Sequence, residues 1–178
     1  MSTAKKYIPS YTVEDYRQWK GDWQLIHGIA ISISPSPAGA HERVALRLGA
    51  WLLSQLEAGD SNCCPYAGLD WIVSEDTVVR PDVMVVCGDQ PEMHLEKPPV
   101  LVAEILSPAT WKADTEIKRA IYNESGVKVY LLVDTDLKTI EVIDFRTGKV
   151  SKIRDSDSIT ISLPDDLEIE IPAQKIFN

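Results

Sequence analysis

The stretch TVVRPDVMVV at residues 77–86 decides the fold, together with VLVAEIL at residues 100–106. Each stretch reads as a buried strand, and each carries one carboxylate, Asp82 in the first and Glu104 in the second. An ionised carboxylate among apolar residues costs free energy unless it is paired or binds a metal ion. The sequence therefore predicts that Asp82 and Glu104 meet at a strand edge and hold a hard divalent cation there.

Patterns typical of helices and strands flank these two stretches. Thr12 is suited to cap a short helix over residues 12–19, and Gly126 is suited to end a helix that starts at Ser107. Apolar residues at helical spacing predict a long helix over 40–57. We expect an α/β or α+β fold, a mixed central sheet flanked by helices with an N-terminal hairpin. Its further strands are predicted at residues 23–26, 29–33, 69–73, 127–134, 138–144 and 167–172.

The length of 178 residues predicts a single domain over 1–178. We expect its core over about 12–145, followed by a C-terminal strand tail over about 146–178. No apolar stretch reaches the roughly 20 residues that span a membrane, and the N-terminus lacks the apolar core of a signal peptide. We expect a cytoplasmic protein that does not associate with a membrane.

The three cysteines are Cys63, Cys64 and Cys87, and their spacing fits no zinc site. An odd count argues against a disulfide framework, and two adjacent cysteines are difficult to bridge. We interpret all three as small apolar residues in a reducing compartment.

The net charge of −9 argues against a simple nucleic-acid binder, which carries a basic surface. It does not exclude a nuclease, because carboxylates around a metal site are partly neutralised once the metal binds.

Lys118 is the best candidate for a cationic partner of the two carboxylates. Asp114, Lys118 and Tyr122 recur at i, i+4 and i+8 of a predicted helix and so share one face. That face borders an apolar stripe of Ile117 and Ile121, so Lys118 could lean over the strand end at Glu104. Alternatively, Asp114 and Lys118 form an ordinary surface ion pair.

The order of these motifs resembles the bacterial Uma-two family of restriction-endonuclease-like proteins, within the PD-(D/E)-x-K nuclease superfamily. The resemblance covers about residues 24–144. It implies a restriction-endonuclease-like fold and a Mg²⁺ or Mn²⁺ ion held by Asp82, Glu104 and the backbone carbonyl of Ile105. The motifs that carry it are Trp-x-Leu-Ile-x-Gly from Trp23, Ser-Pro-Ser-Pro from Ser34, His41, Arg-Pro-Asp-Val-Met-Val-Val from Arg80, Ala-Glu-Ile-Leu-Ser-Pro-Ala-Thr from Ala103, Asp114, Lys118, Tyr122, Gly126-Val127 and Tyr130 to Asp134.

Two positions depart from the pattern of the family. The superfamily motif has lysine two residues after the glutamate, where this chain has Leu106, so the resemblance implies that Lys118 takes the lysine role. The family commonly has glutamate where this chain has Gln24, whose amide can offer an oxygen to a metal or water but no charge.

Further polar residues have both functional and structural interpretations. His41 could contact a phosphate or orient water, or it could be a hydrogen-bonded histidine near a helix N-terminus. Asp70 could be a third acid near the site or only a polar strand end, and Ser107 is better suited to cap a helix than to act as a nucleophile. Lys112 and Arg119 are candidates for phosphate contacts.

The leading hypothesis is a Mg²⁺- or Mn²⁺-dependent endonuclease that hydrolyses phosphodiester bonds in DNA. Asp82, Glu104 and Lys118 would be catalytic, with Gln24, His41 and Asp70 as accessory residues. A homodimer is expected, because cutting both strands of a duplex needs two active sites or one site used twice. The alternatives are a catalytically impaired binding or assembly module of the same fold, and a hydrolase of a small phosphorylated compound.

Overall fold

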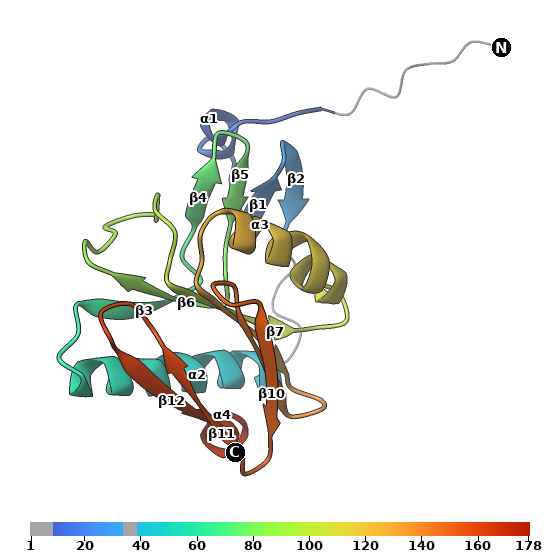
Figure 1. Ribbon diagram of the computed structural model, residues 1–178. Coiled ribbons are helices and arrows are strands. Elements are labelled where there is room, and N and C mark those ends of the chain that lie inside the picture. The colour runs from blue at the N-terminus through green and yellow to red at the C-terminus, as the bar shows by residue number, and fades with distance from the viewer. Residues whose placement is uncertain (1–8, 34–38) are drawn as a thin grey trace.

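The computed structural model describes residues 9–33 and 39–178 (Figure 1). The Ser-Pro-Ser-Pro segment from Ser34 lies outside the described residues. In the part that is described, no helix is long and apolar enough to cross a membrane. The helices are α1 (Val13–Tyr16), α2 (Gly39–Ala58), η1 (Ala113–Lys118), α3 (Arg119–Glu124) and α4 (Ala173–Phe177). The strands are β1 (Trp23–Ile26), β2 (Ile29–Ser32), β3 (Cys63–Ala67), β4 (Trp71–Ser74), β5 (Thr77–Val79), β6 (Val83–Cys87), β7 (Leu101–Leu106), β8 (Val129–Asp134), β9 (Thr139–Asp144), β10 (Lys149–Arg154), β11 (Ser158–Ser162) and β12 (Glu168–Pro172).

A six-stranded mixed sheet forms the centre of the fold, in the order β10-β9-β8-β7-β6-β3. Strands β7 and β8 are parallel, and the other neighbouring pairs are antiparallel. The parallel pair requires a crossover connection, which η1 and α3 provide. Because both faces of this sheet are covered, β7 is buried at five of its six positions and reads as a continuous apolar run.

The stretch 77–86 is two strands and not the single strand that we expected. Strand β5 belongs to a four-stranded sheet of order β2-β1-β5-β4, whereas β6 belongs to the large sheet. Proline cannot donate a ladder hydrogen bond, and Pro81 stands where the chain leaves one sheet for the other. Asp82 therefore lies at the point where the two sheets meet.

The hairpin of β1 and β2 and the Thr12 cap are confirmed. Thr12 accepts a hydrogen bond from the amide of Asp15, and the Asp15 carboxylate accepts one from the amide of Thr12. This capping box holds α1, which ends at Tyr16 and is shorter than predicted. The small sheet projects from one end of the large sheet (Figure 1).

Helices cover opposite faces of the large sheet. The apolar stripe of α2 packs on one face through Val44, Leu48, Leu52 and Leu56, which are all buried. On the other face, Ile121 and Tyr122 of α3 pack against Trp71 and Tyr130. The rings of Trp71 and Tyr122 are stacked with centroids 5.9 Å apart.

The helix expected from Ser107 to about Glu124 contains a π-helical segment, η1, ahead of α3. Ser107 does not cap η1, whose N-cap is Lys112; instead its Oγ accepts a hydrogen bond from the amide of Thr110 at 3.2 Å in the preceding turn. The expected apolar stripe is partly wrong. Ile121 is buried, but Ile117 is 42% exposed, and the inward positions of η1 are taken by Asp114 and Lys118. The wider turn of a π-helix changes which side chains point inward.

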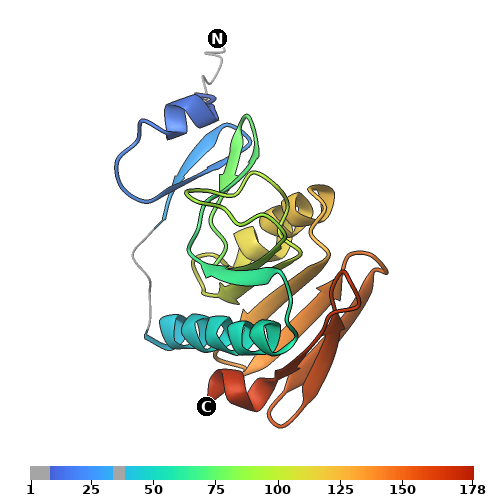
Figure 2. The ribbon, with the colours of Figure 1, turned by 90° about the vertical axis from the view of Figure 1, so that its left-hand side faces the viewer.

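The C-terminal tail over about 146–178 contributes more than the single edge strand that we predicted. Strand β10 extends the large sheet beside β9, and β11 and β12 form a separate pair. Apolar residues from this part, such as Ile161, Ile169 and Ile176, share one buried cluster with α2 and β7. Figure 2 shows β11, β12 and α4 lying alongside α2. Strand β3 was also not predicted; it contains Pro65, and proline is rare inside strands.

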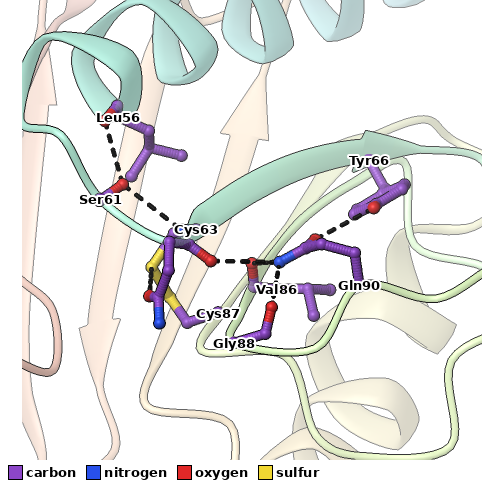
Figure 3. Close-up of a disulfide and its surroundings, with 9 residues drawn as sticks. Leu56, Ser61, Cys63, Tyr66, Val86, Cys87, Gly88 and Gln90 are labelled. Atoms are coloured by element: carbon purple, nitrogen blue, oxygen red, sulfur yellow. Dashed lines mark hydrogen bonds between the residues drawn. A yellow bond between two sulfur atoms is a disulfide. The ribbon is translucent and has the colours of Figure 1, made fainter.

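The interpretation of all three cysteines as unpaired residues is wrong for two of them. Cys63 and Cys87 form a disulfide, and Cys64 is free (Figure 3). The two half-cystines face each other across the antiparallel pair of β3 and β6. Their pairing depends on the strand order, which the spacing of 24 residues does not reveal. Beside the disulfide, the Gln90 amide donates hydrogen bonds to the carbonyls of Asn62 and Gly88 and so fastens the following loop.

Reduction of the disulfide is expected to lower the free energy of unfolding by about 3 kcal/mol, the loop-entropy contribution of a closed loop of this length. Urea unfolding with and without a reductant measures the difference, and Cys87→Ala should match the reduced wild type. Cys64→Ala is the control and should still respond to reductant. A wild type whose unfolding curve is the same under both conditions would contradict the prediction.

Candidate active site

A cleft of about 450 Å³ opens where the two sheets meet, and we call it the acidic cleft. Its carboxylates are Glu42, Asp82, Glu104 and Asp114, and they share it with the ammonium group of Lys118. The small sheet provides one wall, and the first turn of α2 provides part of another. The further lining residues include Gln24, Ile31, Ile33, His41, Arg80 and Thr110.

Asp82 is held in a fixed orientation by two donors. Its Oδ2 accepts a hydrogen bond from the backbone amide of Ile105 at 2.7 Å, and it lies 3.2 Å from Nε2 of His41. The hydrogen bond to Asp82 raises the pKa of His41, although burial opposes the rise. These contacts join the start of β6 to β7 and to the first turn of α2. Within the described residues, Oδ1 of Asp82 has no recorded hydrogen bond, so it is the oxygen available to a ligand.

Glu104 lies at the base of the acidic cleft with only 2% of its surface exposed. Its Oε1 accepts hydrogen bonds from Nζ of Lys118 at 3.0 Å and from the hydroxyl of Tyr122. Burial raises the pKa of Glu104 to about 8, with Asp82 and Asp114 adding to the rise and Lys118 opposing it. Since this pKa already includes the effect of Lys118, a further cation is needed to keep the carboxyl of Glu104 fully ionised at neutral pH.

Lys118 joins two buried carboxylates. Its Nζ is 3.0 Å from Oε1 of Glu104 and 3.0 Å from Oδ1 of Asp114, and its side chain is 6% exposed. Burial disfavours the ammonium, but the two carboxylates outweigh it and raise the pKa of Lys118. Lys118 is therefore charged at neutral pH. The alternative of an ordinary surface pair between Asp114 and Lys118 is wrong, because both side chains are buried.

The contact between Lys118 and Asp114 lacks the alignment of a hydrogen bond, so Oδ1 of Asp114 is a buried oxygen that has only an ionic neighbour. Burial also raises the pKa of Asp114. Two carboxylates thus flank the one ammonium of Lys118, and Asp82 and Glu42 line the same cleft, so the cleft has a surplus of acid. A hard cation would relieve that surplus, and oxygen atoms are the ligands that Mg²⁺ and Mn²⁺ prefer.

The residues present fit a magnesium-type ion held mainly by water and substrate. In the described ranges, no group of three or more His, Cys, Asp and Glu side chains is arranged to hold a metal by itself. Mg²⁺ is commonly bound by only one or two carboxylates, with water and phosphate completing its shell. Asp82 and Glu104 could supply those two carboxylates.

The structure brings five of the predicted site residues together. Asp82, Glu104, Lys118, Gln24 and His41 all line the acidic cleft. Gln24 also contacts the segment between β5 and β6, because its Oε1 accepts a hydrogen bond from the backbone amide of Arg80 at 3.3 Å. The contact recorded for Ile105 is its amide donation to Asp82, and its carbonyl as a metal ligand stays a prediction.

Three other predicted residues lie elsewhere. Asp70 does not line the acidic cleft; its carboxylate binds Nε of Arg80 at 2.7 Å and accepts a hydrogen bond from Tyr16. Because Arg80 also pairs with Asp22 at 2.7 Å, Asp70 helps to fix the segment that precedes Asp82. Lys112 is exposed outside the cleft, and Arg119 lines a separate hollow with Asn123.

Sequence reasoning did not select Asp114 as a site residue, although its spacing from Lys118 was visible. An i, i+4 pair has the same spacing on an exposed face as on a buried one, so the spacing alone could not place it. The contact of Lys118 in η1 with Glu104 in β7 brings this segment to the acidic cleft, which Asp114 then lines.

The model of the Uma2 family, described as "Putative restriction endonuclease", matches residues 13–174. Among solved structures, a crystal structure titled as a putative nuclease belonging to DUF820 from Anabaena variabilis ATCC 29413 is similar, with a TM-score of 0.76 and 17% identity. The similarity covers 93% of this chain and 97% of that chain, and at this identity it shows the fold. No curated protein matches the chain.

Proposed function

The chain belongs to the Uma2 family, and we propose that it is a metal-dependent endonuclease that hydrolyses phosphodiester bonds in DNA. The observation that carries the proposal is the convergence of Asp82, Glu104 and Lys118 in one cleft, from three separate elements. These are the groups that phosphodiester hydrolysis by a restriction-endonuclease-like fold requires: two carboxylates for a hard cation and one ammonium.

Each residue has a role that follows from its contacts. Asp82 would hold the cation through Oδ1, because Ile105 and His41 hold its other oxygen. Mg²⁺ or Mn²⁺ held there would polarise the phosphate and lower the pKa of the attacking water. Lys118 supplies positive charge beside Glu104, where it stabilises charge that develops on the phosphate. The hydroxyl of Tyr122 donates a hydrogen bond to the Glu104 carboxylate and holds it in place.

The lysine role does not require a residue two positions after Glu104. Leu106 stands there, but Lys118 reaches Glu104 from the next helical segment, with Nζ 3.0 Å from the carboxylate. A lysine on a buried strand and a lysine on the helix packed over it can place an ammonium at the same point. This contact supports an intact catalytic set despite the departure from the superfamily motif.

A nuclease assay with two metals tests the proposal. The purified protein is expected to cut plasmid DNA in Mg²⁺ or Mn²⁺, and to lose the activity in a chelator. Calorimetric titration with Mn²⁺ is expected to show binding that Asp82→Asn weakens at least about tenfold, because the substitution removes an anionic ligand. A clean preparation that cuts neither DNA nor RNA and binds no metal would contradict the proposal.

A catalytically impaired binding or assembly module is the second candidate. It is favoured by Gln24, where the family commonly has an acid, and by the binding of Lys118 to two carboxylates within the protein. It predicts that Asp82→Ala leaves stability and partner binding little changed. Loss of a measured nuclease activity in Asp82→Ala would exclude this candidate.

A further inference from the structure

Helix α2 has an exposed stripe on the face opposite to its buried one, with apolar residues in the middle and a charged residue at each end. The stripe, here called the outer stripe of α2, consists of Arg43, Leu46, Ala50, Leu53 and Glu57. Leu46 is 73% exposed and Leu53 is 39% exposed, although the inward stripe of the same helix is fully packed. Figure 2 shows α2 at the margin of the molecule, with the large sheet on its inner side.

The residues of the outer stripe follow the spacing of a helix-pairing seam. Successive members are separated by three, four, three and four residues, which is the repeat by which two helices keep one face in contact. The centre of the stripe is small, since Ala50 is preceded by Gly49, and small residues allow two helices to approach closely. The stripe is therefore suited to pack against a second helix.

The charged residues at the two ends of the stripe indicate that the second helix is α2 of another copy of the chain. Arg43 lies seven residues before Ala50, and Glu57 lies seven residues after it. In an antiparallel pair of α2 helices centred on Ala50, Arg43 of each copy faces Glu57 of the other, and Leu46 meets Leu53 on both sides of the centre. Neither Arg43 nor Glu57 forms an ion pair with another described residue. A parallel pair would instead place like charges together at both ends.

We propose that the outer stripe of α2 is a homodimer interface, in which two copies pair antiparallel about a two-fold axis at Ala50. Such an interface is self-complementary, as two-fold symmetry requires. His41 lies in the first turn of α2, so the two acidic clefts would open at opposite ends of the helix pair, about 27 Å apart along its axis at 1.5 Å per residue. The proposal concerns assembly and stands whether or not the protein cuts DNA.

Sedimentation of the full chain over about 1–100 µM tests the interface, since a dimer dissociates by mass action. The mass is expected to rise from 19.8 kDa toward twice that value. Arg43→Glu and Glu57→Arg should each weaken the dimer at least about tenfold, because each creates two like-charge contacts. Leu137→Glu changes an equally exposed leucine on another surface and is the control that should leave the dimer unchanged.

Mixing the two charge variants separates this arrangement from all others. Arg43→Glu carries only acids at both positions and Glu57→Arg only bases, so an equimolar mixture should regain dimers that neither variant forms alone. The double variant that carries both substitutions should also dimerise. A wild type that remains monomeric throughout the range, or a dimer that none of these substitutions affects, would overturn the proposal and leave the stripe to a different protein.

Discussion

Glu104→Gln is expected to lower the rate of metal-dependent phosphodiester cleavage at least about 100-fold, the scale seen when one preorganised electrostatic contact is lost from an active site. The amide keeps the shape of the carboxyl and can still accept hydrogen bonds from Lys118 and Tyr122. It cannot supply negative charge to a cation. The substitution therefore tests the charge at this position and changes the packing little. Cleavage of a plasmid in Mg²⁺, compared with wild type at equal concentration, measures the effect.

Stability separates a catalytic loss from misfolding in this variant. Burial raises the pKa of Glu104 to about 8, so the fold already tolerates a neutral group at this position. The free energy of unfolding of Glu104→Gln should stay within about 1 kcal/mol of the wild-type value. Glu116→Gln, an exposed acid on the same helical segment as Lys118, is the matched control and should cut normally. Wild-type cleavage by Glu104→Gln would remove Glu104 from the site even if the protein is a nuclease.

Lys118→Met should lower the free energy of unfolding by about 3 kcal/mol, because it breaks a buried ion pair and leaves its partners uncompensated. Methionine preserves the volume of the side chain but removes the ammonium between Glu104 and Asp114. The loss is expected at the lower end of the range for buried pairs, because Glu104 can take up a proton. Urea unfolding at neutral pH measures it, and cleavage should be lost as well.

Two comparisons test the electrostatic origin of this loss. Combining Lys118→Met with Glu104→Gln should cost less than the sum of the two single substitutions, because one of the uncompensated acids is gone. Lowering the pH to about 5 should recover part of the lost stability. Glu104 and Asp114 have raised pKa values in the folded protein, so the folded state takes up protons more readily than the unfolded state as the pH falls. Lys112→Met, at an exposed position, should change stability by no more than about 0.5 kcal/mol. A Lys118→Met variant as stable as wild type would contradict a buried ion pair.

Local patterns in the sequence were sufficient for much of the fold and for three members of the site. The hairpin of β1 and β2, the stripe of α2 and the cap at Thr12 each depend on neighbouring residues along the chain, and all three are confirmed. The division of residues 77–86 between two sheets could not be read in the same way. An apolar run is equally compatible with one strand or two, and only the partners of each strand decide which it is.

The sequence by itself determined that two carboxylates stand in apolar strands and that Lys118 shares a helical face with Asp114 and Tyr122. These properties follow from residue type and from helical and strand periodicity. Only the tertiary structure decided that Asp82 stands where two sheets meet, that Asp114 enters the acidic cleft and Asp70 does not, and that Cys63 faces Cys87. The physical reason is that each of these depends on which distant segments pair and on which face of a helix is buried, and neither follows from spacing along the chain.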